Sequence, residues 1–364
     1  MKIMPGVSYF KNKKVLLRCD FDVPVEGIKI LEKFRVEKQK ETIDFLLKQS
    51  SVVMVAHIKA IESFKDMLPQ LKEILGHEIG FIDNMDELNK KSYNLKPGEL
   101  YLLENIRNWS GEEENDKLFA KTLATGFDVY INNAFAVCHR NHASISAITE
   151  FLPSYAGFLV AEEVSQLNNL INLPSKGKIF IMGGAKASTK IPVIKNFINR
   201  SECILTGGVI ANDILKARGV DVGLSVIDSN IEELIEGLDV TDKRLVMPVD
   251  YNIFENKIFD IGPKTIDEYI NTIKGAEIII WNGPVGLFED ERFSIGTDSI
   301  ADAIASSDAL KVLGGGDTIT AVNKLDLIDK FDFVSTGGGA MLAFLAGDKL
   351  PGLKALGYYT VRDL

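Results

Sequence analysis

Short runs of apolar and β-branched residues recur along the whole chain, each followed by a turn or a glycine cluster. Runs of this kind are typical of buried strands. They lie at residues 15–17, 52–55, 100–103, 129–131, 179–182, 204–205, 245–247, 278–280, 310–313 and 333–334. Between them, apolar residues recur with helical spacing, at residues 36–47, 191–198, 266–273 and 300–305. This alternation predicts an α/β fold whose parallel sheets are covered by helices on both faces.

The alternation is interrupted between residues 151 and 178. Residues 158–171 have the spacing of a helix, and Pro174 and Gly177 lie in a breaker segment after it. We therefore expect two domains, 1–155 and 178–347, joined by a connector helix and hinge at 156–177.

Composition and charge narrow the class of protein. The 364 residues suit two domains, because single domains are usually about 100–200 residues long. The net charge of −10 argues against an extended nucleic-acid surface. No signal pattern is present and no apolar run approaches the roughly 18 residues of a membrane span, so we expect a cytoplasmic protein without a membrane partner. The three cysteines lack CxxC spacing, which argues against a disulfide framework or a zinc site.

Glycine-rich turns follow five of the predicted strands in the second half of the chain. Ligands of open parallel sheets bind beyond the carboxyl ends of the strands. The five turns therefore predict one backbone-lined site for anionic groups, although neither a P-loop nor a GxGxxG pattern is present. The turns are Gly183-Gly184, Gly207-Gly208, Gly283-Pro284, Gly314-Gly315-Gly316 and Gly337-Gly338-Gly339.

The triple-glycine turn at Gly314 has the clearest chemistry. A buried strand ends there, three residues without Cβ let a ligand approach the backbone, and a helix with free N–H groups follows. Asp317 leaves two interpretations open. Its carboxylate can cap the helix or, beside a bound phosphate, hold Mg²⁺.

Basic residues take the equivalent positions in the first half of the chain. Guanidinium groups bind carboxylate and phosphate oxygens in pairs, so their recurrence near strand ends predicts a shared anion pocket. These residues are Arg18, Arg35, His57, Arg107, His139 and Arg140.

Several longer segments then form a recognisable set. They are residues 18–24 (RCDFDVP), 102–107 (LLENIR), 132–135 (NNAF), 139–144 (HRNHAS), 183–186 (GGAK), 281–289 (WNGPVGLFE), 314–318 (GGGDT) and 335–340 (STGGGA). With these segments in this order, the chain resembles the phosphoglycerate kinase family over essentially its full length. The tryptophan segment is the most specific of them.

The resemblance implies a bilobal kinase with two Rossmann-like domains, parallel sheets and a connector helix, in which the tail 348–364 packs back on the first domain. It implies reversible phosphoryl transfer between 1,3-bisphosphoglycerate and ADP, giving 3-phosphoglycerate and ATP, with Mg²⁺ as cofactor. The implied partners are these small molecules alone, and the implied assembly is a monomer.

The resemblance also implies two sets of site residues. The acid-substrate site would comprise Arg18, Asp20, Asp22, Arg35, His57, Arg107 and Arg140. The nucleotide site would comprise Gly184, Lys186, Lys190, Gly207, Gly208, Asn282, Pro284, Leu287, Glu289, Gly314, Gly315, Gly316, Asp317 and Thr318, with Asp317 as the metal ligand. Catalysis would fall to Arg35, Lys186, Gly315 and Gly338.

The departures from the family pattern concentrate in the first domain. Residues 56–61 (AHIKAI) stand where the family has Ser-His-Leu-Gly-Arg-Pro, so one arginine is missing. Asp22 replaces a usual Asn, while Asn133 and Thr189 each replace a usual Asp. Two alternatives therefore stay open: a kinase of a related small phosphorylated or carboxylated acid, and a nucleotide-binding homologue with reduced catalysis.

Overall fold

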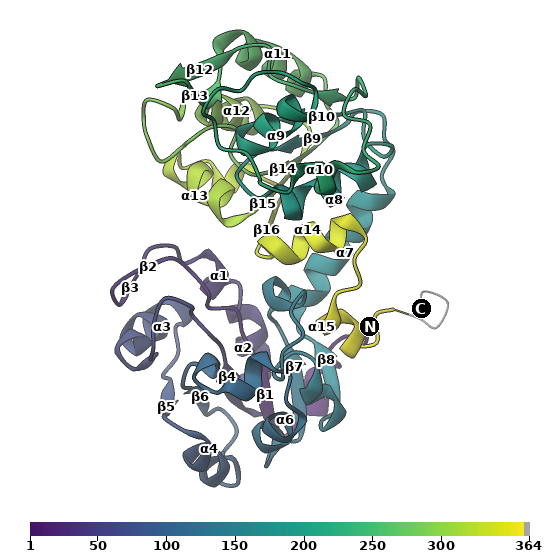
Figure 1. Ribbon diagram of the computed structural model, residues 1–364. Coiled ribbons are helices and arrows are strands. Elements are labelled where there is room, and N and C mark those ends of the chain that lie inside the picture. Colours follow the sequence, from purple (N-terminus) through teal and green to yellow (C-terminus); the bar gives the residue numbers. More distant parts are fainter. Residues whose placement is uncertain (360–364) are drawn as a thin grey trace. The chain divides into compact units, whose positions relative to one another are not determined.

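The computed structural model describes residues 1–359, so residues 360–364 of the predicted C-terminal tail lie outside the described part. The chain divides into two compact units (Figure 1). Unit 1 comprises Met1–Ser165 together with the C-terminal segment from Lys349, and unit 2 comprises Gln166–Asp348. The boundary falls within helix α7 (Phe158–Asn172).

Unit 1 is built around a six-stranded sheet in the order β5-β6-β4-β1-β7-β8, and each of its pairings is parallel. Strand β4 is buried at every position, as expected for a central strand that helices cover on both faces. The strands are β1 (Lys14–Arg18), β4 (Ser51–Val55), β5 (Gly80–Ile82), β6 (Leu100–Leu103), β7 (Val129–Asn132) and β8 (Ser154–Ala156). A small hairpin, β2 (Val25–Glu26) with β3 (Lys29–Ile30), lies outside this sheet.

Unit 2 contains a second six-stranded parallel sheet, in the order β11-β10-β9-β14-β15-β16. Its strands are β9 (Lys178–Met182), β10 (Cys203–Thr206), β11 (Leu245–Val246), β14 (Ile278–Asn282), β15 (Leu310–Gly314) and β16 (Phe333–Ser335). An antiparallel hairpin, β12 (Tyr251–Phe254) and β13 (Lys257–Ile261), is separate from this sheet. Glu255 and Asn256 both have positive φ, which is the conformation that a tight two-residue hairpin turn requires.

Helices connect the strands of both sheets. In unit 1 they are η1 (Val7–Phe10), α1 (Phe34–Glu37), α2 (Lys40–Leu47), η2 (Lys65–Met67), α3 (Leu68–Leu75), α4 (Met85–Ser92), η3 (Ile106–Asn108), α5 (Ser110–Glu113), α6 (Lys117–Ala124), η4 (Phe135–Val137), η5 (Ala147–Glu150) and α15 (Pro351–Ala355). In unit 2 they are α8 (Ala187–Phe197), α9 (Gly208–Ala217), α10 (Ile231–Ile235), α11 (Pro263–Lys274), α12 (Ile295–Ala305), α13 (Gly316–Lys324), η6 (Ile328–Lys330) and α14 (Gly338–Ala346).

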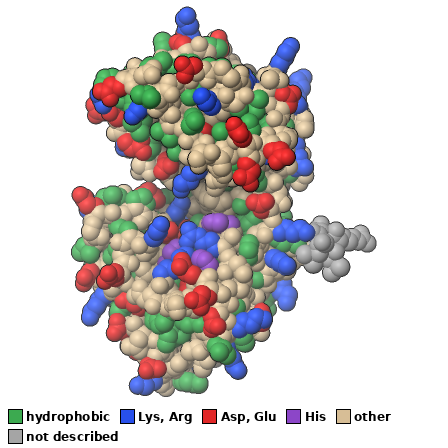
Figure 2. Space-filling model, viewed as in Figure 1, with side chains coloured by type: hydrophobic (Ala, Val, Ile, Leu, Met, Phe, Trp, Pro, Cys, Tyr) green, Lys and Arg blue, Asp and Glu red, His purple; other side chains and the backbone are tan. Residues whose placement is uncertain are grey.

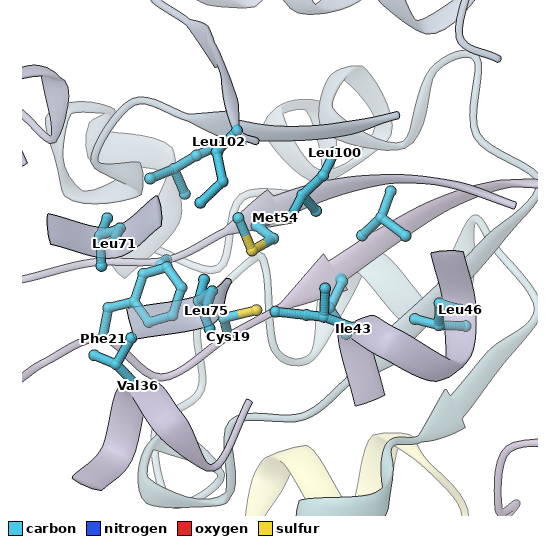
Figure 3. Packing of buried hydrophobic residues seen from close by; sticks show 14 of the residues in the cluster. Cys19, Phe21, Val36, Ile43, Leu46, Met54, Leu71, Leu75, Leu100 and Leu102 are labelled. Atoms are coloured by element: carbon cyan, nitrogen blue, oxygen red, sulfur yellow. The ribbon is translucent and has the colours of Figure 1, made fainter. Parts of the chain in front are cut away.

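The core of unit 1 shows why these segments form helices. Figure 3 shows Ile43 of α2, Leu75 of α3 and Met54 of β4 in one apolar cluster, and all three side chains are fully buried. Burying a side chain of this size stabilises the fold by about 1.5–3 kcal/mol. A second apolar cluster, which includes Leu16 and Leu103, covers the opposite sheet face. The predicted arrangement of helices on both faces is therefore confirmed.

The ten predicted strands are confirmed, one predicted helix differs from the structure, and two strands of the unit 1 sheet were missed. Residues 36–47 form two helices, α1 and α2, because the buried Gln39 side chain donates to the Arg35 carbonyl at 3.1 Å and its amide oxygen accepts from Asn133. Strands β5 and β8 were not predicted, because each is only three residues long and carries little apolar patterning.

The glycines of two neighbouring turns in unit 2 are required by backbone packing. A Cβ on Gly183 would lie 2.1 Å from the carbonyl oxygen of Pro284, and one on Gly283 would lie 2.1 Å from the carbonyl oxygen of Gly183. Gly316 differs, because a Cβ there would meet no atom within 4 Å. The turns at β9 and β14 thus pack against each other, while Gly316 faces open space.

Within residues 1–359, no helix combines the length and apolar character needed to cross a membrane.

The packing of these turns predicts different stabilities for two matched variants. Gly183→Ala should destabilise the protein by about 1–3 kcal/mol, because the new methyl group overlaps backbone atoms that cannot rotate away. Gly316→Ala should change stability by less than about 1 kcal/mol. Urea unfolding followed by circular dichroism measures both. Equal stability of the two variants would contradict the packing argument.

Candidate active site

A basic pocket of about 480 Å³ lies at the carboxyl ends of the strands of unit 1. On the face seen in Figure 2, Lys, Arg and His side chains gather on unit 1 with acidic side chains beside them. His57 and Lys59 follow β4, Arg107 follows β6, and Arg140 follows β7. The lining residues are His57, Ile58, Lys59, Ile61, Glu62, Asn105, Arg107, Asn108, Glu113 and Arg140. Three of the predicted acid-site residues therefore meet in one pocket.

Arg18 supports this pocket from beneath. It is fully buried, and its guanidinium donates to Ser144 Oγ at 2.9 Å, to the Cys19 carbonyl at 2.5 Å and to His57 Nδ1 at 3.2 Å. Its donors are thus directed at protein acceptors. The structure places Arg18 behind His57, away from the lining of the pocket.

His57 is a neutral imidazole between arginines. Burial, and then the charges of Arg18, Arg107 and Arg140, lower the pKa of His57 to about 2. Arg18 Nη2 lies 3.2 Å from Nδ1, and Arg140 Nη1 lies 3.4 Å from Nε2. Because the shorter guanidinium contact is at Nδ1 and the Asp22 Oδ2 acceptor lies 3.6 Å from Nε2, the proton of the neutral ring is assigned to Nε2. The ring therefore contributes no charge at neutral pH, and the positive potential of the pocket comes from Arg107, Arg140 and Lys59.

Asp22 fixes the loop that departs from the family pattern. Its Oδ1 accepts a hydrogen bond from Lys59 N at 3.0 Å, and its carbonyl accepts one from Arg35 Nη1 at 2.7 Å. Arg35 Nε also lies 3.9 Å from Asp20 Oδ2, and burial raises the pKa of Asp20 while Arg35 opposes that rise. Arg35, Asp20 and Asp22 thus form a support behind the Lys59 loop and are absent from the pocket lining.

Two further residues of this cluster were not predicted. Glu113 of α5 forms an ion pair with Arg107, and the ring of His142 lies 3.5 Å from the Arg107 guanidinium. Burial, and then the charges of Arg140 and Arg18, lower the pKa of Arg107. The only sequence signal for Glu113 was an acidic run after Trp109, which is also what an exposed helix start would show. His139, which was predicted with the basic set, is not a lining residue.

In unit 2, the five glycine turns follow strands β10, β9, β14, β15 and β16, which are neighbours in the sheet. An apolar pocket of about 210 Å³ adjoins three of these turns. The predicted residues that line it are Gly184, Gly208, Pro284, Leu287, Glu289 and Asp317. Gly207 is adjacent to this set, while Gly338 is not a lining residue; it begins α14, where its N–H is one of the free donors of a helix start.

The two predicted lysines lie at the start of α8. Lys190 is buried, and a Cβ on Gly184 would lie 2.5 Å from its Nζ, so the ammonium group rests on the glycine turn. Burial lowers the pKa of Lys190 to about 8, with Asp317 opposing this shift and Lys186 adding to it. Lys186 is the exposed N-cap residue of α8. The ammonium groups of Lys186 and Lys190 therefore lie near the Asp317 carboxylate, which lines the apolar pocket.

The start of α13 is suited to bind anionic oxygen. Gly315 is its N-cap residue, with φ +97°, and no side chain caps the helix. Thr318 Oγ1 accepts a hydrogen bond from Gly283 N at 2.7 Å. The buried Asn282 Nδ2 has no hydrogen-bond partner among the described residues, and it would lie 3.1 Å from a Cβ on Gly315. An unpartnered donor beside a helix N-terminus favours a phosphate group.

Asp317 is the second residue of α13, so the interpretation of this residue as the N-cap is wrong. The N-cap of α13 has a positive φ, which Gly315 adopts without strain. The exposed Asp317 carboxylate instead faces the pocket near Lys190. Mg²⁺ typically binds one or two carboxylates together with substrate phosphates and water, so this donor set fits a nucleotide-bound Mg²⁺.

Comparison with known proteins identifies relatives along the whole chain. A family model described as phosphoglycerate kinase matches residues 7–348. The phosphoglycerate kinase of Leptospira biflexa is 38% identical over an alignment of 379 positions, gaps included, which covers 95% of this chain and 96% of the relative. That of Borrelia garinii is 35% identical, covering 98% of this chain and 99% of the relative.

Solved structures agree with these relatives. The crystal structure of phosphoglycerate kinase from Pyrococcus horikoshii OT3 matches with a TM-score of 0.86 at 31% identity, over 97% of this chain and 98% of that one. The structure from Coxiella burnetii matches with a TM-score of 0.80 at 32% identity, over 96% and 97% of the two chains.

The Arg107–Glu113 ion pair predicts that Glu113 competes with anions for the basic pocket. Glu113→Gln should tighten the binding of inorganic sulfate by about 1.4- to fivefold, since exposed ion pairs contribute about 0.2–1 kcal/mol. Isothermal titration at constant low ionic strength measures the change. Glu114→Gln, which removes the same charge from the adjacent exposed position, is the control. Equal tightening in both variants would show a general charge effect and contradict competition at Arg107.

Proposed function

This chain belongs to the phosphoglycerate kinase family, and we propose that its basic pocket binds the acid substrate and its glycine turns bind the nucleotide. The enzyme transfers a phosphoryl group reversibly between 1,3-bisphosphoglycerate and ADP, giving 3-phosphoglycerate and ATP, and it uses Mg²⁺. The single observation that carries the site assignment is the contrast between the two sheets. One sheet ends in charged side chains and the other in backbone N–H groups.

In the proposed acid site, Arg107, Arg140 and Lys59 contact the phosphate and carboxylate oxygens directly. They are the cationic residues that line the pocket. The Nε2–H of neutral His57 donates a hydrogen bond without adding charge.

The remaining predicted acid-site residues hold this pocket in place. Arg18 orients His57 through its contact with Nδ1. Arg35, Asp20 and Asp22 position the Lys59 loop. The Arg35 N–H groups that do not bind the Asp22 carbonyl could still contact substrate, so Arg35 keeps its predicted catalytic role. Ala60 stands where the family has arginine, and the neighbouring Lys59 supplies a compact charge without the bidentate binding of a guanidinium.

In the proposed nucleotide site, the turns after β9, β10 and β14 bind the base, and polar side chains together with the turn after β15 bind the phosphates. Gly184, Gly207, Gly208, Pro284 and Leu287 contact the base, and the exposed Glu289 accepts hydrogen bonds from the ribose hydroxyls. Lys186, Lys190, Asn282, Thr318 and the N–H groups of Gly314, Gly315 and Gly316 contact the phosphates. Asp317 holds Mg²⁺, which neutralises phosphate charge when it is bound.

The residues present match the chemistry of phosphoryl transfer to a carboxylate. A carboxylate is already ionised at neutral pH, so the reaction needs no general base. Transfer depends on alignment and on positive groups around the moving phosphoryl group. We propose that Lys186, Arg35 and the backbone N–H groups of Gly315 and Gly338 supply these groups.

We propose the corresponding domain roles. Residues 1–155 with the tail 348–364 form the acid domain, residues 178–347 form the nucleotide domain, and 156–177 form the hinge whose motion brings the two ligands together and excludes water. We also propose a cytoplasmic monomer, because the substrates are free metabolites. The net charge of −10 supports the absence of a nucleic-acid partner.

A coupled assay tests the acid substrate. Purified protein with Mg-ATP and 3-phosphoglycerate should release ADP, and a panel of related acids, such as glycerate and 2-phosphoglycerate, should give much lower kcat/KM. The panel is included because Ala60 stands where the family has arginine, and the neighbouring Lys59 can restore its charge but not its bidentate binding. Nucleotide binding without ADP release from 3-phosphoglycerate would contradict the proposed acid site, and faster turnover of another acid would identify the alternative substrate.

The role of Lys186 is tested in the same assay. Lys186→Ala should lower kcat by at least about a hundredfold while the KM for Mg-ATP changes by less than about threefold, because the lost charge acts on the transition state. Lys195→Ala is the matched control on α8, since Lys195 Nζ donates to the Glu236 carbonyl at 2.6 Å. Unchanged kcat in Lys186→Ala would remove this residue from the mechanism.

A further inference from the structure

The first turn of α8 is held by a carboxylate from a distant part of unit 2. Asp228 Oδ2 accepts a hydrogen bond from Ala187 N at 3.0 Å. Ala187 is the first residue of α8, and the N-cap residue Lys186 has no side-chain capping bond. A carboxylate at this position satisfies one free N–H and interacts favourably with the helix dipole. Asp228 therefore fixes the point at which the Lys186 side chain leaves the backbone.

Helix α9 in turn holds Asp228. Asp213 Oδ1 accepts a hydrogen bond from Asp228 N at 2.8 Å, and Asn212 Nδ2 donates to the Val226 carbonyl at 3.2 Å. Two consecutive side chains of α9 thus bind one short segment. Asn212 and Val226 also line the apolar pocket, so this segment adjoins the proposed nucleotide site.

Asp213 has the properties of a functional residue more than those of a structural one. Its side chain is fully buried, and its Oδ2 has no hydrogen-bond partner among the described residues. Burial, with an added contribution from the Asp228 charge, raises the pKa of Asp213 to about 6. Burying this carboxylate costs free energy, and the hydrogen bond from Asp228 N to Oδ1 offsets part of that cost.

We propose that Asp228 and Asp213 are positioning residues for phosphoryl transfer, which act through Lys186. Asp228 fixes the start of α8 by accepting from Ala187 N, and Asp213 fixes Asp228 by accepting from its backbone N–H. This inference rests on the proposed role of Lys186. A small displacement of an aligned charge can cost up to about a hundredfold in rate, so loss of Asp228 affects alignment more than ground-state binding.

The primary test is the kinetics of Asp228 variants in the full-length protein with Mg-ATP and 3-phosphoglycerate. Asp228→Ala should lower kcat by about ten- to a hundredfold, with less than a threefold change in the KM for Mg-ATP. Asp228→Asn keeps an oxygen for Ala187 N and should recover kcat to within about threefold of the parent. Asp221→Ala is the control, because Asp221 accepts a backbone N–H from Gly223 at 2.9 Å in the neighbouring segment.

A double-mutant cycle separates positioning from general stabilisation. In the Lys186→Ala background, Asp228→Ala should lower kcat by less than about twofold, because the residue through which it acts is gone. An undiminished effect in that background would overturn the inference, as would an active Asp228→Ala protein with only a lowered Tm. If Asp228→Ala does not fold, Asp228→Glu, which keeps the charge but displaces it, should lower kcat at an unchanged Tm, and parental kcat there would equally overturn the inference. An inactive parent protein would instead refute the proposed function.

Discussion

One row of paired residues determines where the nucleotide-binding turns lie. Thr206, Met182, Asn282, Gly314 and Ser335 are neighbours across four parallel strand pairs, and each is the last residue of its strand. Five glycine turns therefore begin at the same level of the sheet. The central strands β9 and β14 are buried at every position, so a slip of one residue would exchange the side chains that pack on the two faces and disrupt the packing of both. The buried strands thus fix the alignment of the turns, and the contact of the Gly183 and Gly283 turns depends on it.

The two units use different means to attract anions, with different electrostatic consequences. Unit 1 gathers charged side chains, and their mutual repulsion and burial lower the pKa of Arg107 and keep His57 neutral. It therefore needs internal counterions, which Asp22 and Glu113 provide. Unit 2 relies mainly on N–H dipoles at helix starts, which carry no net charge and need few counterions. Lys186, Lys190 and Asp317 are exceptions, placed where a metal-bound phosphate would compensate their charges.

The elements that depend on local pattern were predictable from the sequence, and those that depend on side-chain reach were not. Apolar runs and glycine turns located ten of the twelve strands of the two sheets, because burial and backbone conformation act over a few residues. The same reasoning could not distinguish Arg18, which supports His57 from below, from Arg107, which lines the pocket. It also missed the Glu113 ion pair and the contact from Asp228 to α8, since each joins segments whose proximity only the fold creates. The roles of these residues in catalysis remain predictions.

The return of the chain to unit 1 has a consequence for biosynthesis. Gly352 N of α15 donates to the Cys138 carbonyl at 2.9 Å, and Lys2 N donates to the Leu356 carbonyl at 3.2 Å. Unit 2 is one continuous segment, so all of its residues leave the ribosome before α15 does. Unit 1 must wait for the segment that follows unit 2, although most of unit 1 is translated first. The nascent protein can therefore complete unit 2 before unit 1, and the Cys138 carbonyl lacks its α15 donor until that segment has been made.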